Sequence, residues 1–215
     1  MSKLKLPHAS GNSMSIGAPA TNPASDLELK LPATIGTAGQ VLRNSSTPGT
    51  LEFGSALQVK QAVNSAQASE SVSDGVFEDI AGLSVSITPS STSSKILVFY
   101  KVAMASTKGD YNTYIRIVRD STAIGIGDQT GSNRPRVTTY HPTGPTAWND
   151  YEVIHHSNMF LDNPVGFNLG DSLTYKLQWT DSYSQTFYLN RSVNNTDSKY
   201  YPTQISQITV MEVSG

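Results

Sequence analysis

The sequence contains no cysteine. Disulfides, thiolate nucleophiles and thiolate metal sites are therefore excluded, and stability has to come from packing or assembly. The sequence is also poor in charge, since 15% of its 215 residues are charged and the net charge is -2. A nucleic-acid partner normally requires a basic surface, so we expect no nucleic-acid binding.

Long apolar runs are missing as well. The longest is ILVFY at residues 96–100, whereas a bilayer-spanning helix needs ~20 apolar residues. The N-terminal stretch MSKLKLPHASGN has no apolar segment of the kind found in secretory signals. We therefore expect a protein that is neither inserted in a membrane nor exported by such a signal.

Residues 1–54 have few large apolar side chains, and prolines and glycines divide them into short pieces. This pattern is typical of very short strands joined by turns. The tetrad LKLP occurs twice, at residues 4–7 and 29–32, which is weak evidence for a repeat. So few apolar residues cannot offset the loss of chain entropy in one copy. Either the segment is a disordered arm, or identical chains share its burial in an intertwined β shaft.

Residues 55–72 carry the one helical pattern, which predicts a short helical connector. Ser55 and Gln58 have the spacing of a capping box. Ala56, Val59, Val63 and Ala66 have the a/d spacing of a thin coiled-coil seam. The alternative is a helical spacer that lies on the larger domain.

Residues 73–215 contain about ten short runs of strand-forming residues separated by turns. Tyr175, Leu177 and Trp179 alternate with polar residues, as in a strand with one buried face. Residues 94–105 are apolar on both faces, which predicts a central strand covered on both sides or a strand at a subunit contact. This pattern predicts an antiparallel two-sheet sandwich, most simply a jelly-roll head. The predicted strands lie near residues 76–81, 83–88, 94–105, 111–119, 122–127, 136–141, 151–161, 172–180, 186–191 and 204–213.

Catalytic patterns are absent. The acidic residues mostly lie in turns beside Gly, Ser or Asn, and G-x-S-x-G does not occur. His155 and His156 are adjacent in a predicted strand, so they point to opposite faces and cannot chelate one ion in one chain. A calcium ion in the turn at residues 194–197 is an alternative without EF-hand spacing. We expect no enzymatic activity, no cofactor and no metal.

Aromatic residues flank three polar loops, and aromatic faces edged by Asn and Asp suit sugar rings. The alternative is that these aromatic side chains cover loop roots or fill subunit contacts. The candidate ligand-binding residues are Tyr140, His141, Trp148, Tyr151, Tyr183, Tyr200 and Tyr201.

Several segments resemble tail-fibre and related virion appendage proteins of marine tailed phages and cyanophages. The resemblance is carried by LPATIGTAGQVLRNSSTPGTLEFG at residues 31–54 and by ITPSSTSSKILV, YIRIVRDSTAIGIGD and YYPTQISQITVMEVSG further along. It covers residues 4–215. It implies a homotrimer with an interlocked N-terminal β region and a head similar to the C1q and tumour-necrosis-factor fold. It implies no catalytic residues.

The resulting prediction is an all-β virion structural protein, assembled in the host bacterial cytoplasm. Residues 1–54 form a trimeric shaft that attaches to other virion proteins, 55–72 the connector and 73–215 a jelly-roll head that binds host surface glycan. The alternatives are a capsid head fibre or decoration protein without a receptor role, and a glycan-degrading tailspike. The predicted trimer seam consists of Leu27, Leu29, Leu31, Leu51, Phe53, Ala56, Val59, Val63 and Ala66.

Overall fold

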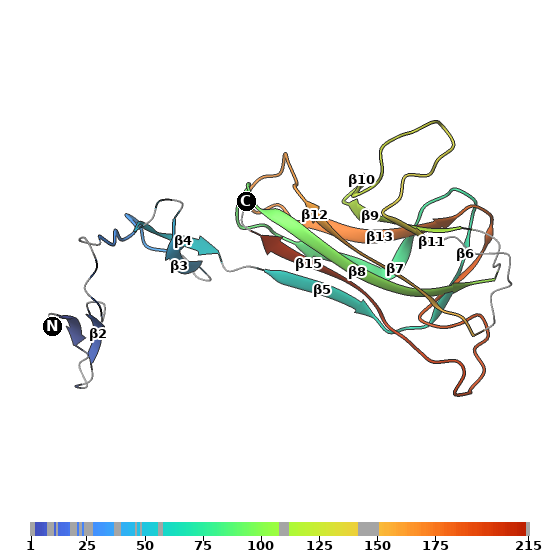
Figure 1. The fold of residues 1–215 in the computed structure, drawn as a ribbon, viewed down its shortest axis with the longest axis horizontal. Helices are drawn as coiled ribbons and strands as arrows, with labels where there is room; N and C mark the ends of the chain where they lie inside the picture. Colours follow the sequence, from blue (N-terminus) through green and yellow to red (C-terminus); the bar gives the residue numbers. More distant parts are fainter. Residues whose placement is uncertain are drawn as a thin grey trace. The chain divides into compact units, whose positions relative to one another are not determined.

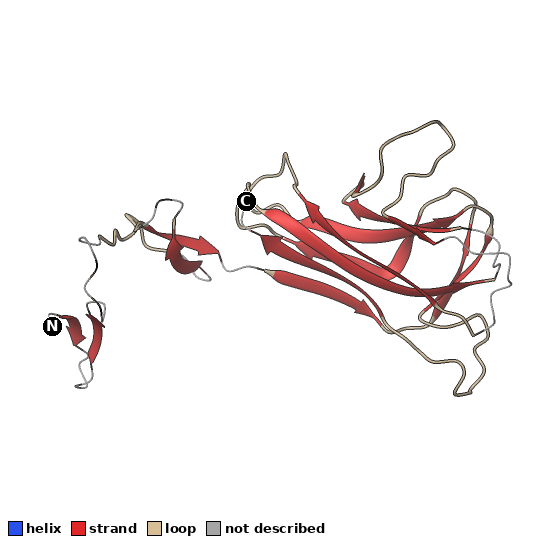
Figure 2. Ribbon diagram, in the orientation of Figure 1, coloured by secondary structure: helices blue, strands red, loops and turns tan. Residues whose placement is uncertain are grey.

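The protein is all-β, as predicted. Every regular element among the described residues of the computed structural model is a strand (Figures 1 and 2). The chain divides into two compact units, Met1–Ala56 and Leu57–Gly215. The structure describes residues 3–7, 11, 13–17, 21, 23, 28–36, 40–45, 47, 49–55, 58–107, 112–141 and 151–213.

The first unit contains two separate antiparallel hairpins. Strand β1 (Lys3–Pro7) pairs with β2 (Ser13–Gly17), and β3 (Gln40–Asn44) pairs with β4 (Leu51–Ser55). The first LKLP tetrad is part of β1, whereas the second makes only an isolated bridge from Lys30 to Thr50. The two tetrads therefore do not mark a structural repeat.

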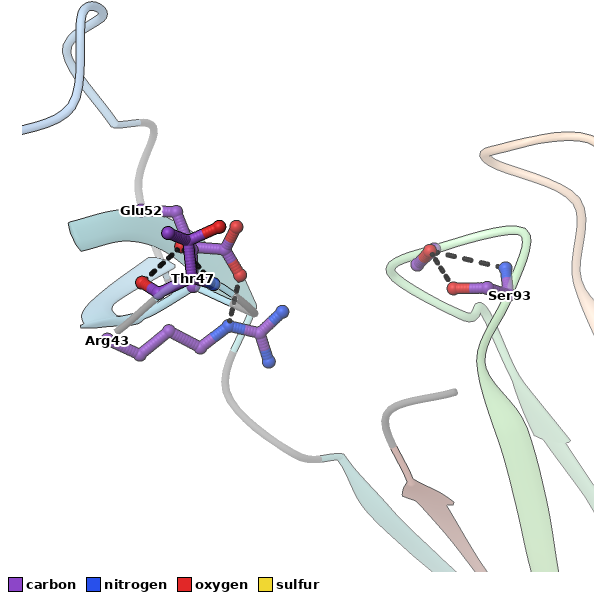
Figure 3. A network of polar contacts seen from close by, with 6 residues as sticks. Arg43, Thr47, Glu52 and Ser93 are labelled. Atoms are coloured by element: carbon purple, nitrogen blue, oxygen red, sulfur yellow. Dashed lines mark hydrogen bonds and ion pairs between the residues drawn. The ribbon is translucent and has the colours of Figure 1, made fainter. Parts of the chain in front are cut away.

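Polar contacts hold the β3–β4 hairpin (Figure 3). Arg43 Nε donates to Glu52 Oε1 at 3.1 Å, and both side chains are nearly half exposed. In the turn, the Thr47 N–H donates to Ser45 Oγ at 3.1 Å. An exposed ion pair contributes only ~0–1 kcal/mol, and an isolated hairpin is marginally stable. These polar contacts therefore contribute little to the stability of the first unit.

The second unit, which we call the head, is a sandwich of two antiparallel sheets (Figure 1). Its strands are β5 (Val59–Asn64), β6 (Ala68–Val72), β7 (Glu78–Ile87), β8 (Lys95–Ser106), β9 (Thr113–Arg119), β10 (Thr122–Ile124), β11 (Thr139–His141), β12 (Ile154–Asp162), β13 (Leu173–Asp181), β14 (Gln185–Leu189) and β15 (Ser206–Val213).

Three pairs of short strands lie in line and act as interrupted single strands. Strands β14 and β15 both pair with β8, with Leu189 opposite Met104 and Gln207 opposite Lys101. In the same way, β6 and β5 pair with β14 and β15, and β10 and β11 both pair with β9. The first sheet is thus ordered β12, β8, β14/β15, β5/β6, and the second β10/β11, β9, β13, β7.

This order confirms the predicted jelly roll. When each in-line pair is counted as one strand, the strands pair from the two ends of the head sequence inward. The pairs are β5/β6 with β14/β15, β7 with β13, β8 with β12, and β9 with β10/β11. Such nested pairing across two sheets is the jelly-roll arrangement. The core lies between the sheets, where Trp179 packs edge-on against Phe187 at a centroid distance of 5.1 Å. Tyr175, Leu177 and Trp179 are all buried, as their alternation predicts.

The predicted helical connector is wrong for the described residues. Val59–Asn64 and Ala68–Val72 are strands of the first sheet, and Ala62 and Ala68 pack against the core. Val59 and Val63 are four residues apart, a spacing that places them on one face of either a helix or a strand. The local pattern is therefore ambiguous. Residues Val59–Asn64 form a strand because each of them pairs with a residue of β15.

One predicted break within a strand is also wrong. The predicted strands 76–81 and 83–88 form the single strand β7, which runs through Gly82. Gly82 has a φ of 74°, and the register with β13 shifts at this point. A glycine with positive φ is typical of a β-bulge, which bends a strand without ending it.

The chain enters the head at one end of the sandwich, which we call the entry end. There the Glu212 N–H donates to the Gln58 carbonyl at 2.9 Å. The buried Glu212 carboxylate accepts hydrogen bonds from Ser90 and Ser94 in the turn at residues 88–94. Ser93, also in this turn, bonds to Ser91 (Figure 3). Gln58, predicted to cap a helix, instead donates to the Thr88 carbonyl at 2.8 Å.

The opposite end of the sandwich, the far end, carries the turns at residues 73–77 and 182–184 and the start of β12. Strands β5 and β6 run from the entry end to Val72, which lies opposite Gln185. The far end is thus separated from the point of chain entry by the length of the sheet (Figure 1).

Candidate functional site

Three of the predicted ligand-binding residues form one cluster, which we call the tyrosine cluster. Tyr151 stacks on Tyr201 with a centroid distance of 5.0 Å and an interplanar angle of 13°. Tyr151 also contacts Tyr200 edge-on at 6.1 Å. Tyr200 is 60% exposed and Tyr151 is 49% exposed. The cluster therefore presents aromatic surface to solvent, joining residues about 50 positions apart in sequence through tertiary contact.

The other candidates lie elsewhere. Tyr140 and His141 are on β11, at the edge of the second sheet, and both are exposed. Tyr183 lies in the turn after β13, where its N–H donates to Asp181 Oδ1 at 3.0 Å. Trp148 lies outside the described residues. No measurement tests whether any candidate binds a ligand, so this role stays a prediction.

Tyr200 and Tyr201 belong to residues 190–205, an excursion that interrupts the strand formed by β14 and β15. Its root is Asn190, which is fully buried and has a φ of 61°. Asn190 Nδ2 donates to the carbonyls of Asn64 at 2.8 Å and Ala66 at 2.9 Å, and its Oδ1 accepts from Ser206 Oγ at 2.7 Å. Asparagine tolerates this left-handed conformation better than most residues. Sequence reasoning did not identify Asn190, because its role depends on three distant segments.

Contacts within the excursion hold its shape. The Arg191 guanidinium lies 4.3 Å from the Tyr188 ring centre and donates to the carbonyls of Ser192 and Val193. Asn194 Nδ2 donates to Tyr201 Oη at 2.9 Å, which ties the excursion to the tyrosine cluster. A cation–π contact and charged hydrogen bonds of this kind favour one loop conformation. These contacts therefore hold the loop that carries Tyr200 and Tyr201 in one conformation.

The adjacent histidines lie as predicted, with His155 exposed and His156 buried. His156 Nε2 and Thr113 Oγ1 are 2.9 Å apart, and His141 contacts the His156 ring edge-on at 6.2 Å. Burial, with a smaller contribution from His141, lowers the pKa of His156 to about 4. His156 is therefore neutral at pH 7, as a packing residue.

This pKa predicts loss of stability in acid. Below its unfolded pKa of about 6.5, the unfolded chain protonates this histidine and the folded chain does not until about pH 4. The free energy of unfolding should therefore fall by about 2 kcal/mol between pH 6.5 and 4.5 on this account. Denaturant titrations of the wild type and His156→Gln at both pH values measure the difference between them.

The titration of Asp181 has the opposite effect on the free energy of unfolding, which it raises on acidification. Burial raises the pKa of Asp181 to about 6, although hydrogen bonds from Gln185 and the following backbone oppose the rise. The folded chain therefore takes up this proton first, and acidification from pH 6 to 4 stabilises it. Asp181→Asn should lose more stability on acidification than the wild type, and His156→Gln less. Parallel pH profiles of all three proteins would contradict both assignments.

No group of three or more metal-ligating side chains occurs in the described part of the chain. In the turn considered for calcium, Asn194 Oδ1 already accepts from the Thr196 N–H at 3.1 Å and hydroxyl at 2.6 Å. Among the described residues, no helix has the length and apolar character to cross a membrane.

The fold and the cluster define a jelly-roll protein with exposed aromatic surface on a braced loop. No protein-family model matches the sequence, and no curated protein matches it either. Two solved structures from infectious bursal disease virus are similar at 12% identity: the Gx strain, with a TM-score of 0.30, and the VP2 subviral particle, with 0.29. The matches cover 81% and 86% of this chain and 47% and 46% of the viral chains, so this chain spans about half their length. The fold assignment rests on strand order, not on these matches.

Proposed function

We propose that this protein is a non-enzymatic structural component of a phage virion, a homotrimeric fibre whose head binds host surface glycan. The observation that carries the proposal is apolar surface that a single copy leaves uncovered. This surface occurs in the first unit and again on one face of the head.

In residues 28–36, 41–43 and 49–54 of the first unit, no apolar side chain is buried. A unit without a core is not expected to be stable alone. Copies that place these side chains against one another would supply the missing burial and pair exposed strand edges. The apolar residues exposed here include Leu29 at 61%, Leu31 at 73%, Ile35 at 95%, Val41 at 47% and Leu42 at 49%. Leu27 and Ala56 of the predicted seam lie outside the described residues.

The outer face of the first sheet carries a row of apolar side chains that crosses four strands. Leu161 lies opposite Leu97, Leu97 opposite Met211, and Met211 opposite Val59. In the next row, Met159 lies opposite Phe99. Leu161 is 47% exposed, Val59 56% and Met159 59%. We call these six residues the apolar face. Sheets that face water on one side normally alternate apolar and polar residues, so such a face favours a protein partner.

Chain connectivity favours a second copy as that partner. If the first units associate, their chains converge where each passes into its head. Val59 follows Ala56 by three residues, which span at most about 11 Å of extended chain. Val59, which belongs to the predicted seam and is 56% exposed, is thus among the head residues nearest the point of convergence, and Val63 of the seam follows it on β5 at 51% exposure. The number three comes from the resemblance to phage fibres.

The far end would then point away from the virion. The first unit would attach to other virion proteins, and the tyrosine cluster and neighbouring loops would meet the host surface. Three weak sugar sites on one rigid assembly would act together, so avidity would compensate for the weakness of each site.

The oligomeric mass in solution tests the proposal. The full chain should have three times the mass of one chain at micromolar concentration. Met211→Lys should weaken association by about 100-fold or more, because burying an unpaired ammonium costs several kcal/mol. Ser84→Lys, on the exposed face of the other sheet, is the matched control and should stay trimeric. A monomeric wild type, or a Met211→Lys protein of unchanged mass, would overturn the proposal.

A further inference from the structure

A groove at the far end combines groups that the sequence does not bring together. It lies on the outer face of the second sheet, where Tyr114 of β9 is opposite Thr180 of β13. One wall is the loop segment at residues 132–135 and the other is the turn that contains Asp74. Its volume of about 340 Å³ lies within the range of small-molecule sites, which is about 300–1,000 Å³.

The floor of the groove holds a polar atom without a partner. Thr180 lies on the polar side of β13, yet it is fully buried, and its hydroxyl makes no hydrogen bond in the described part of the chain. Such a group destabilises the fold and needs an explanation. Thr174, on the same side of the same strand, is paired, with its Oγ1 2.9 Å from Ser86 Oγ. Hydroxyls on this side of the strand can therefore find partners, and the one that lacks a partner is the one in the groove.

The walls offer both signs of charge and an aromatic surface. Arg134 on the loop and Asp74 on the turn both line the groove and are exposed, and Tyr114, which also lines it, is half-buried. The Asp181 carboxylate accepts from the Tyr183 N–H and from Gln185, so Asp74 is the acid left to face a ligand. The groove lining thus includes one carboxylate, one guanidinium and an aromatic ring, a set that suits an uncharged ligand with several hydroxyls.

The loop wall is weakly held. Residues 127–136 are all exposed, and within this loop Arg136 Nε donates to the Gly127 carbonyl at 2.7 Å. A loop with few buried contacts moves at low energetic cost. Because residues 132–135 line the groove together with Thr180, an outward shift of this loop is the movement that would open the groove around the Thr180 hydroxyl.

We propose that this groove binds a neutral hexopyranose ring of a surface glycan. The C–H face of the sugar lies on Tyr114, its hydroxyls bond to Asp74 and Arg134, and one hydroxyl pairs with Thr180 once the loop shifts. This inference rests on the proposed glycan-binding function and places a sugar site apart from the tyrosine cluster.

Thr180→Val separates a binding role from a structural one. Removing an unpaired buried hydroxyl should raise the melting temperature by about 2–4 °C. It should also weaken the binding of methyl hexopyranosides about tenfold. Binding to the full chain is measured by NMR titration with the gluco, galacto and manno forms. Arg134→Gln should weaken binding similarly, and Thr174→Val, which removes a paired hydroxyl outside the groove, should leave it unchanged.

The outcomes distinguish this site from the proposed function. Wild-type protein that binds none of the three hexosides, or Thr180→Val protein that binds like the wild type, overturns the groove site. If Tyr200→Ala alone abolishes binding, the sugar site is the tyrosine cluster, and the groove is excluded while glycan binding stands. Failure of the fibre proposal is seen separately, as a monomeric wild type.

Discussion

Replacing Asp162 with alanine is expected to lower the free energy of unfolding by about 2–4 kcal/mol, because it breaks a largely buried ion pair and takes an acceptor from both the Arg119 guanidinium and the Tyr175 hydroxyl. Asp162 lies on β12 of the first sheet and is 5% exposed. Its Oδ2 accepts from Arg119 Nη1 of β9 at 2.6 Å and from Tyr175 Oη of β13 at 2.7 Å. Both donors belong to the second sheet, so one carboxylate joins the two layers.

The surface pair of Asp79 and Lys176 is the matched control. Its atoms are 2.7 Å apart, nearly the same distance, but the Asp79 side chain is 53% exposed. Solvent screening limits such a pair to ~0–1 kcal/mol, so Asp79→Ala should cost no more than about 1 kcal/mol. Denaturant titrations at one protein concentration compare the two variants. Equal losses would show that burial does not set the value of the Asp162 pair.

Asn190→Ala should cost about 3–4 kcal/mol, from three lost side-chain hydrogen bonds and a residue forced into a left-handed conformation. The carbonyls of Asn64 and Ala66 would lose a donor, and the Ser206 hydroxyl would lose its acceptor while still accepting from the Ala103 N–H. The effect should extend to the tyrosine cluster, because Asn190 is the root of the excursion that carries Tyr200 and Tyr201. Hydrogen exchange across residues 191–205 should therefore accelerate.

Asn190→Gly separates the cost of the lost hydrogen bonds from the cost of the left-handed backbone conformation. Glycine adopts positive φ without strain, so this variant loses the hydrogen bonds alone, and the difference between Ala and Gly measures the backbone term, about 1 kcal/mol. Denaturation gives the stabilities, and exchange measured by mass spectrometry gives the local effect. A loss below about 1 kcal/mol for Asn190→Ala would mean that water replaces these bonds and that the excursion does not depend on its root.

Strands whose side chains alternate were predictable from the sequence. Residues 173–179 alternate between buried and half-buried positions, and so do residues 206–213, because each strand has one face on the core. Residues 59–72 were not predictable locally. Their Ala, Ser and Gln side chains have weak preferences, and long-range pairing with β14 and β15 overrode the helical pattern.

The candidate site was predictable in part. Tyr151, Tyr200 and Tyr201 were recognisable as aromatic residues in polar loops, a general feature of binding surfaces. Their contact with one another was not, because it requires the excursion to fold back toward the start of β12. The groove around Thr180 was missed altogether. A threonine on the polar side of a strand carries no sign that a loop 45 positions earlier will line the same groove.

Composition and alternation alone determined that the larger part of this chain, residues 73–215, is built of strands, that the chain lacks disulfides and that residues 1–54 carry few large apolar side chains. These properties are sums over side chains, or follow from the two-residue repeat of a strand, so neighbouring residues suffice to establish them. Only the tertiary structure decided which strands pair, which apolar face of the head stays uncovered and which polar groups meet. Such contacts join residues far apart in sequence, and their energies exist only once the chain has folded around them.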